Sequence, residues 1–148
     1  MRDIIILNTG AHWKLHDSNA VENSKGKNGY IIAVYNTLQW LKENFHGHIF
    51  YRELVNPDPY FRNRTAPLTQ LERSSIKRTS PEFLQYNWAY FEWMNSIWEA
   101  KSKELEMTNF HTLGIKNLSE LRGDAVTDEL HYCIPGVQDI WNQVLFQN

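Results

Sequence analysis

The chain has 148 residues, a formal net charge of −2, and hydrophobic and aromatic fractions of 42% and 14%. This length suits one globular domain, and the slightly acidic balance argues against nucleic-acid binding, which usually needs a basic face. The sequence has no apolar run near the roughly 20 residues of a membrane span, and its first residues are too acidic for a signal peptide. Cys133 is the only cysteine, which excludes an internal disulfide and argues against a cysteine-based metal site.

The first half of the chain reads as strand, helix and strand. Residues Ile4–Leu7 form a continuous apolar run, typical of a strand buried on both faces of a parallel sheet. A polar loop is expected over 12–28, a helix over 30–45 and a second strand over 48–54. The prolines of Asn56–Pro59 end that strand because proline removes ladder donors.

The second half adds more helices and a weaker strand. Residues 62–79 are basic and irregular, and Ser80 with Pro81 marks a helix start. That helix is expected over 82–105. After it come a strand near 107–113, a helical turn at 118–121, a loop over 124–135 and a helix over 137–146. The alternation predicts an α/β fold with helices covering a parallel sheet.

The loop before the last helix carries a candidate acid–base pair, Asp128 and His131. In serine acyl-transfer sites a histidine takes the proton of the nucleophile, and a carboxylate orients that histidine. One loop can supply both side chains at this spacing if it turns back on itself. The alternative is a solvated carboxylate beside a histidine that caps the next helix.

A second candidate group follows the first strand, where sites form in open parallel sheets. The Asn8 amide could donate to an oxyanion, and Gly10 lets the backbone approach a ligand closely. The alternative is a turn that only ends the strand.

Two segments together resemble a known family. "DIIILNTGAHW" (3–13) and "DELHYCIPGVQDIWNQVLF" (128–146) resemble the C-terminal half of the trichome-birefringence-like, or PC-esterase, family, within the SGNH (GDSL-like) hydrolase superfamily. The residues that match the end motif in order are Asp128, His131, Tyr132, Cys133, Pro135, Gly136, Asp139, Trp141 and Asn142. The resemblance implies that residues 1–148 are the C-terminal portion of one parallel-sheet, flavodoxin-like SGNH domain that lacks its N-terminal part.

The resemblance also implies a function, carbohydrate O-acetyltransferase or acetylesterase, with a Ser-His-Asp mechanism. Asp128 and His131 then take the catalytic roles, Asn8 and Gly10 are oxyanion candidates, and His12 and Trp13 are candidates for substrate binding. No cofactor is implied; an acyl donor such as acetyl-CoA is left open. The family suggests the Golgi or secretory lumen.

The sequence departs from the family at two places. It has no Gly-Asp-Ser; the nearest string, His16-Asp17-Ser18, follows the Asn-Thr-Gly-Ala-His-Trp segment, the wrong order for this family. The family carries its nucleophile in an earlier segment, so a missing N-terminal half is an expected partner beside the carbohydrate. Glu129 stands where the family usually has cysteine. A truncated gene, a split protein and an inactive paralogue all fit.

Other patterns carry weaker expectations. His46 and His48 lack a third ligand, so no metal site is expected. The aromatic residues of the 82–105 helix could stack on sugars but favour a core role. The rival function is a non-catalytic carbohydrate-binding or interaction remnant that keeps the Asp–His loop for structural reasons.

Overall fold

The computed structural model describes residues 3–13, 15, 20–77, 83, 87–128 and 130–147. The chain divides into two compact units. The first contains Met1–Leu54 and Thr79–Thr112, and the second contains Val55–Arg78 and Leu113–Asn148. Within the described part of the chain, no helix has both the length and the apolar character needed to cross a bilayer.

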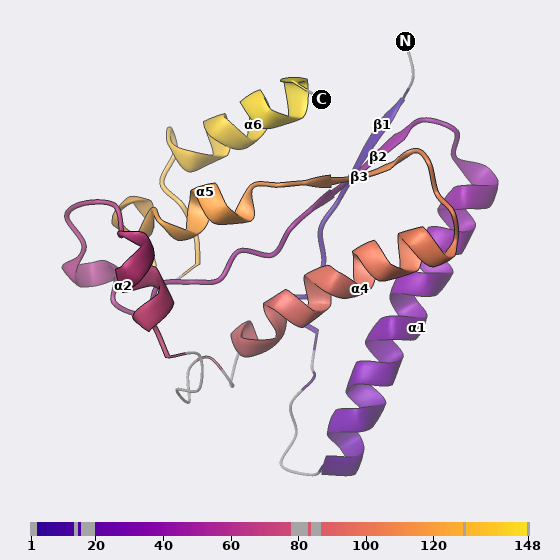
Figure 1. Ribbon diagram of the computed structural model, residues 1–148, viewed down its shortest axis with the longest axis horizontal. Helices are drawn as coiled ribbons and strands as arrows, with labels where there is room; N and C mark the ends of the chain where they lie inside the picture. Colours follow the sequence, from indigo (N-terminus) through magenta and orange to yellow (C-terminus); the bar gives the residue numbers. More distant parts are fainter. Residues whose placement is uncertain are drawn as a thin grey trace. The chain divides into compact units, whose positions relative to one another are not determined.

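A three-stranded parallel sheet forms the centre of the first unit, which confirms the predicted α/β class (Figure 1). Its strands are β1 (Ile4–Leu7), β2 (His48–Arg52) and β3 (Phe110–Leu113), in the sequential order β1-β2-β3. The register pairs Ile4 with His48 and Leu7 with Tyr51. All three strands lie within or close to the ranges expected from the sequence.

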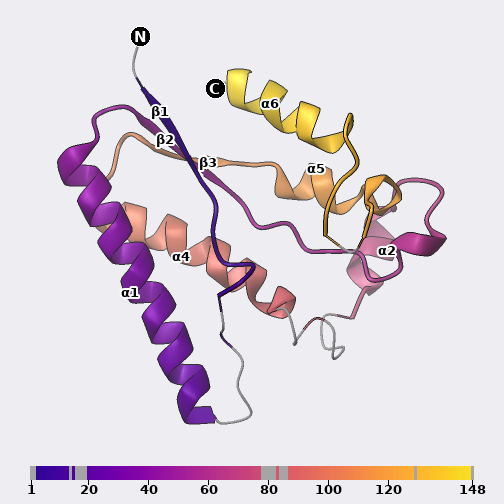
Figure 2. The same ribbon diagram turned by 180° about the vertical axis from the view of Figure 1, so that it is seen from behind.

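Two helices, α1 (Ala20–Asn44) and α4 (Phe91–Glu104), cover one face of this sheet (Figures 1 and 2). The ring of Tyr51 on β2 stacks on Trp98 of α4, with centroids 4.9 Å apart and an interplanar angle of 17°. Right-handed crossovers that proceed in one direction along a sheet place their helices on the same face. The shared helical face therefore follows from the sequential strand order together with this rule.

The side chains of β1 differ in exposure between the two faces. Ile5 and Leu7 face α1 and line a depression with Trp40 and Leu41. Ile4 and Ile6 point to the opposite face and are 55% and 51% exposed. β1 is thus an edge strand whose sequence is apolar on both faces, although edge strands usually carry charges or proline.

A chain of hydrogen bonds ties the end of β1 to both helices. The indole of Trp98 donates to the Tyr30 hydroxyl at 3.0 Å, and that hydroxyl donates to the Thr9 carbonyl at 3.3 Å. Burial raises the pKa of Tyr30 to about 12, so the phenol stays protonated and keeps its donor. These bonds fix the segment that follows β1, which carries the predicted oxyanion candidates.

The prediction of a loop over 12–28 is wrong from Ala20 onward, because α1 begins at that residue. Asparagine, serine and glycine are weak helix formers, so the local sequence favours a loop. Tertiary contacts hold the early turns instead. The Trp13 indole donates to the Gly26 carbonyl at 3.1 Å, and the Lys27 ammonium lies 4.8 Å from the centroid of the Tyr90 ring.

The single helix expected over 82–105 is wrong at Asn87, whose φ of 60° is left-handed. A 3₁₀ helix, η2 (Trp88–Tyr90), follows it, and α4 begins only at Phe91. The Asn87 amide donates to the Trp13 carbonyl at 2.6 Å, so a long-range contact stabilises the interruption. The expected start at Ser80 and Pro81 lies outside the described residues.

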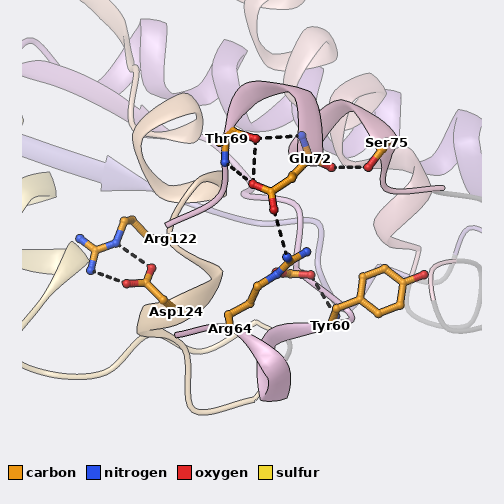
Figure 3. Close-up of polar contacts among 8 residues, drawn as sticks. Tyr60, Arg64, Thr69, Glu72, Ser75, Arg122 and Asp124 are labelled. Carbon is orange, nitrogen blue, oxygen red and sulfur yellow. Dashed lines mark hydrogen bonds and ion pairs between the residues drawn. The ribbon is translucent and has the colours of Figure 1, made fainter. Parts of the chain in front are cut away.

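The second unit is built from short helices. It contains the 3₁₀ helix η1 (Phe61–Asn63), α2 (Gln70–Ser75), α5 (Lys116–Glu120), the 3₁₀ helix η3 (Gly123–Ala125) and α6 (Val137–Gln147). η1 and α2 lie in the stretch expected to be irregular. A capping box starts α2: the Thr69 hydroxyl accepts from the Glu72 N–H at 3.2 Å, and the Glu72 carboxylate accepts from the Thr69 N–H at 2.8 Å (Figure 3).

A buried polar cluster lies at the centre of the second unit. The Arg73 guanidinium approaches the Glu120 carboxylate to 2.6 Å, with both side chains less than 10% exposed. The Asn56 amide donates to the same carboxylate at 2.6 Å. Near η3, the Asp58 carboxylate accepts from Arg64 at 2.8 Å and packs directly on Gly123.

Candidate functional site

Asp128 and His131 form a hydrogen-bonded pair. The Nδ1 atom of His131 lies 2.8 Å from the Oδ2 atom of Asp128. The other carboxylate oxygen, Oδ1, accepts the backbone N–H groups of Leu130 and His131, each at 2.8 Å. The carboxylate is therefore held by its own loop while it binds the imidazole.

The loop turns back on itself, as the spacing of the pair requires. Val126 and Tyr132 form an isolated antiparallel bridge, and the Thr127 N–H donates to the His131 carbonyl at 2.7 Å. The Cys133 N–H donates to the Ala125 carbonyl at 2.8 Å. These bonds close the loop on both sides of the pair.

The electrostatics of the loop favour an ionised carboxylate at Asp128. Partial burial would raise the pKa of this group. The hydrogen bonds from the N–H groups of His131 and Leu130, with the His131 ring, outweigh that effect and lower the pKa to about 2. A carboxylate that accepts a hydrogen bond from Nδ1 fixes the proton of the neutral His131 ring on that nitrogen.

The pair is accessible from solvent. The side chain of His131 is 77% exposed and that of Asp128 is 48% exposed. Because Nδ1 of His131 is bound to the carboxylate, Nε2 is the ring nitrogen that can accept a proton from a substrate or nucleophile. An oriented imidazole with an available Nε2 can take a proton from a hydroxyl and return it to a leaving group.

The other residues of the end motif support the loop. The Tyr132 hydroxyl donates to the Ser119 carbonyl at 2.8 Å, and its ring lies edge-on to Trp141 with centroids 5.7 Å apart. The Asp139 carboxylate accepts from the Gly136 N–H at 2.9 Å at the start of α6. Sequence reasoning assigned Tyr132 and Trp141 no task beyond matching the motif, and it assigned Ser119 no role in this loop.

The predicted oxyanion and substrate-binding residues gather in the first unit. Asn8, Gly10, His12 and Trp13 line one surface pocket of about 320 Å³, at the carboxyl end of β1. This is where the sequence placed a site. The pair Asp128–His131 belongs to the second unit, so the structure brings the predicted residues together in two groups, one in each unit.

Arg52 fixes the side-chain amide of Asn8. The guanidinium donates to Asn8 Oδ1 at 2.6 Å, and Asn8 Nδ2 donates to the Arg52 carbonyl at 2.8 Å. An amide nitrogen has two N–H groups, so this clamp occupies one and leaves the other for a ligand. Asn8 itself is exposed. Its geometry suits the predicted role of a preorganised donor.

Gly10 is needed for packing. Its φ is 133°, and a Cβ atom there would meet Leu54 at 2.6 Å and Met94 at 2.8 Å. Only glycine fits this backbone and this space. Its use as an oxyanion donor stays a prediction.

The aromatic residues of α4 and η2 are mainly core residues. Trp88, Phe91 and Trp98 are buried, which agrees with the favoured reading; Tyr86 lies outside the described residues. Among the residues described, no three histidine, cysteine or acidic side chains gather as metal ligands. His48 instead meets His111, with ring nitrogens 3.3 Å apart. The His16-Asp17-Ser18 string lies outside the described residues.

Two arginines of the basic stretch over 62–79 have acidic partners. Arg64 pairs with Asp58, and Arg73 with Glu120. Arg122, close to the pair-bearing loop, binds Asp124 through two nitrogens at 2.9 and 3.1 Å (Figure 3). The ion pairs of Arg64 and Arg73 neutralise part of the positive charge of residues 62–79.

Comparisons with known proteins leave the chain unassigned, since neither a family model nor a curated protein matches it.

Proposed function

We propose that this protein carries the acid–base part of a carbohydrate O-acetyltransferase or acetylesterase of the SGNH type. The observation that carries the proposal is the 2.8 Å bond between His131 Nδ1 and Asp128 Oδ2, in a loop that leaves Nε2 accessible. The sequential parallel strands, with both helices on one face, are compatible with half of a doubly wound sheet. The resemblance in residues 3–13 and 128–146 supplies the reaction class.

The mechanism needs a serine, and residues 1–148 contain no Gly-Asp-Ser. We assign the serine to a separate segment with strand, Gly-Asp-Ser and helix that binds this chain. The serine oxygen attacks the carbonyl carbon of the acetyl donor while its proton passes to His131 Nε2. The oxyanion collapses, and the bond from the carbonyl carbon to the leaving atom breaks; this atom is oxygen in an ester and sulfur in acetyl-CoA. His131 returns the proton to that leaving atom. Water or a sugar hydroxyl then attacks the acyl-serine by the same steps.

Other residues take supporting roles in this proposal. Asp128 orients the imidazole and stabilises its charged form. The Asn8 amide donates to the oxyanion, with Gly10 as a second candidate, and His12 and Trp13 contact the sugar. The acyl donor is left open between acetyl-CoA and another ester. The resemblance favours a secretory or Golgi setting.

The second candidate is a non-catalytic carbohydrate-binding or interaction remnant. One observation favours it: Asp128 accepts two backbone N–H groups of its own loop, a bonding pattern that is sufficient reason to retain the residue. Under this reading the pair only stabilises the loop.

Ester turnover separates the two candidates. The chain alone should hydrolyse an activated acetyl ester only at the weak rate of an exposed imidazole. Adding the serine-bearing segment should raise the rate, and His131→Ala should then remove most of it. His46→Ala is the matched control, because His46 is an exposed histidine of the first unit. Equal rates with and without His131 would reject the enzyme proposal.

A further inference from the structure

Ser119 is hydrogen-bonded to both Tyr132 and Trp141, the two side chains that support the Asp128–His131 loop. It lies in α5 and is completely buried. Its hydroxyl donates to the Ile115 carbonyl at 2.7 Å and accepts the Trp141 indole N–H at 2.8 Å. Its own carbonyl accepts the Tyr132 hydroxyl at 2.8 Å. One serine thus connects α5, α6 and the residue next to His131.

Tyr132 connects Ser119 to the loop that carries Asp128 and His131. It follows His131 directly and forms the bridge with Val126 that closes the loop. Its carbonyl accepts from the Gln138 side chain at 3.1 Å, so both ends of the residue are bound. Burial raises the pKa of the Tyr132 phenol, which therefore remains a hydrogen-bond donor over the physiological range.

Among the residues that the structure describes, the hydrogen bonds to the two side chains of the pair come from its own loop. Both side chains are substantially exposed. A loop that is not anchored at its ends can open, which separates the imidazole from the carboxylate, whereas catalysis needs the imidazole at a fixed position. The bonds from Tyr132 to α5 and α6 supply that fixed reference.

We infer that Ser119 is a positioning residue for His131, acting through Tyr132 and Trp141. It does not touch the imidazole; it fixes the end of the loop from which the imidazole projects. The inference rests on the proposed function for its catalytic meaning, but the positioning itself can be measured without any reaction.

The first measurement is the tautomer of the His131 ring in the full chain, by nitrogen NMR, with His131→Ala to assign the signal. In the native protein the Asp128 bond holds the proton on Nδ1. Ser119→Ala and Tyr132→Phe should both lower the fraction of this tautomer and broaden the His131 signals. Tyr132→Phe keeps the ring volume, so it remains informative if Ser119→Ala fails to fold.

Matched controls separate positioning from general stability. Ser102 is also a buried serine that bonds a carbonyl of its own helix, and its carbonyl also accepts a donor from outside that helix. Tyr60 is an exposed tyrosine. Ser102→Ala and Tyr60→Phe should leave the His131 tautomer unchanged, even where Ser102→Ala lowers the melting temperature.

The second measurement is ester turnover after the serine-bearing segment is added. Ser119→Ala and Tyr132→Phe should lower kcat by about 10- to 100-fold, the range expected for a displaced catalytic group. An unchanged His131 tautomer in both variants would overturn the inference, whatever the activity. If Ser119→Ala and Tyr132→Phe alter the His131 tautomer while His131→Ala leaves ester turnover unchanged, the positioning role is upheld and the proposed function is rejected.

Discussion

The guanidinium of Arg73 on α2 meets the carboxylate of Glu120 at the end of α5 across 2.6 Å, in the interior of the second unit. Removing one member of a buried ion pair leaves the other charge without compensation, which is strongly destabilising. Glu120 adjoins Ser119, so the Arg73–Glu120 ion pair also anchors α5, the helix that supports the Asp128–His131 loop.

Glu120→Gln and Arg73→Met should each reduce the free energy of unfolding by about 3–5 kcal/mol, because each leaves one buried charge unpaired. The double variant Arg73→Met/Glu120→Gln should lose less than the sum of the two. Urea unfolding followed by circular dichroism measures the three values. The exposed pair Lys101–Glu104 is the control, and Glu104→Gln should change stability by less than about 1 kcal/mol. Strictly additive losses at Arg73 and Glu120 would contradict this coupling.

Gly123→Ala should destabilise the second unit by about 1–3 kcal/mol through overpacking. A Cβ atom at this position would collide with the Asp58 carboxylate, which holds Arg64. Gly114→Ala is the matched control, since no atom lies within 4 Å of its added Cβ, and it should change stability by less than about 1 kcal/mol. Thermal unfolding of the two variants measures the contrast. Similar melting temperatures for both would mean that Asp58 moves aside easily.

The Asp128–His131 pair should respond to acid in a defined window. The pKa of Asp128 is lowered to about 2 in the folded chain, below the roughly 3.9 of an unperturbed aspartate. Because the pKa of this carboxyl is lower in the folded than in the unfolded chain, ionised Asp128 stabilises the native state at pH values above about 4. This contribution to the free energy of unfolding is lost as the pH falls from about 4 through about 2. Carbon NMR of the carboxyl group follows this titration. In His131→Ala the midpoint should move upward, toward the unperturbed value; a midpoint already near 4 in the native chain would contradict the hydrogen-bond assignment.

The oxyanion role of Asn8 predicts a kinetic defect. With the serine-bearing segment present, Asn8→Ala should lower kcat by about 10²–10³-fold, the usual loss for one oxyanion donor. Arg52→Met should have a smaller effect, because it releases the amide without removing it. Asn36→Ala, at an exposed position of α1, is the control. An unaltered kcat in Asn8→Ala would mean that Asn8 only ends β1 and does not donate to the oxyanion.

The exposed apolar edge of β1 predicts self-association. Edge strands and apolar patches without charges invite pairing with other chains. The isolated chain should bind a hydrophobic dye and elute heterogeneously in size exclusion, and Ile4→Lys/Ile6→Lys should reduce both effects. Leu71→Lys is the control, at an isolated leucine that is 80% exposed. A monodisperse, dye-silent native chain would contradict the prediction.

Local patterns predicted some of these features well. The apolar run Ile4–Leu7 is β1, and α6 begins at the predicted Val137. The Asp128–His131 bond was also predicted, because three-residue spacing in a returning loop is a local property.

Features that depend on distant contacts were missed. The left-handed Asn87 bonds Trp13, and the early turns of α1 rest on the Trp13–Gly26 bond, which no sequence window of a few residues can reveal. Ser119 was missed for the same reason, since its partners lie 13 and 22 positions away. The capping box at Thr69 and Glu72 is a local pattern, but it lies in a basic stretch whose composition favours irregular structure.

The closed loop around Asp128 and His131 also bears on the order in which the native structure forms. The bonds that orient the pair join residues only two to eight positions apart, so closing them requires little loss of chain entropy. Contacts of such short sequence separation form early in folding, before distant pairings such as β1 with β2. The carboxylate and imidazole can therefore meet while the sheet is still assembling, and the later bonds of Tyr132 and Trp141 to Ser119 then keep the loop closed.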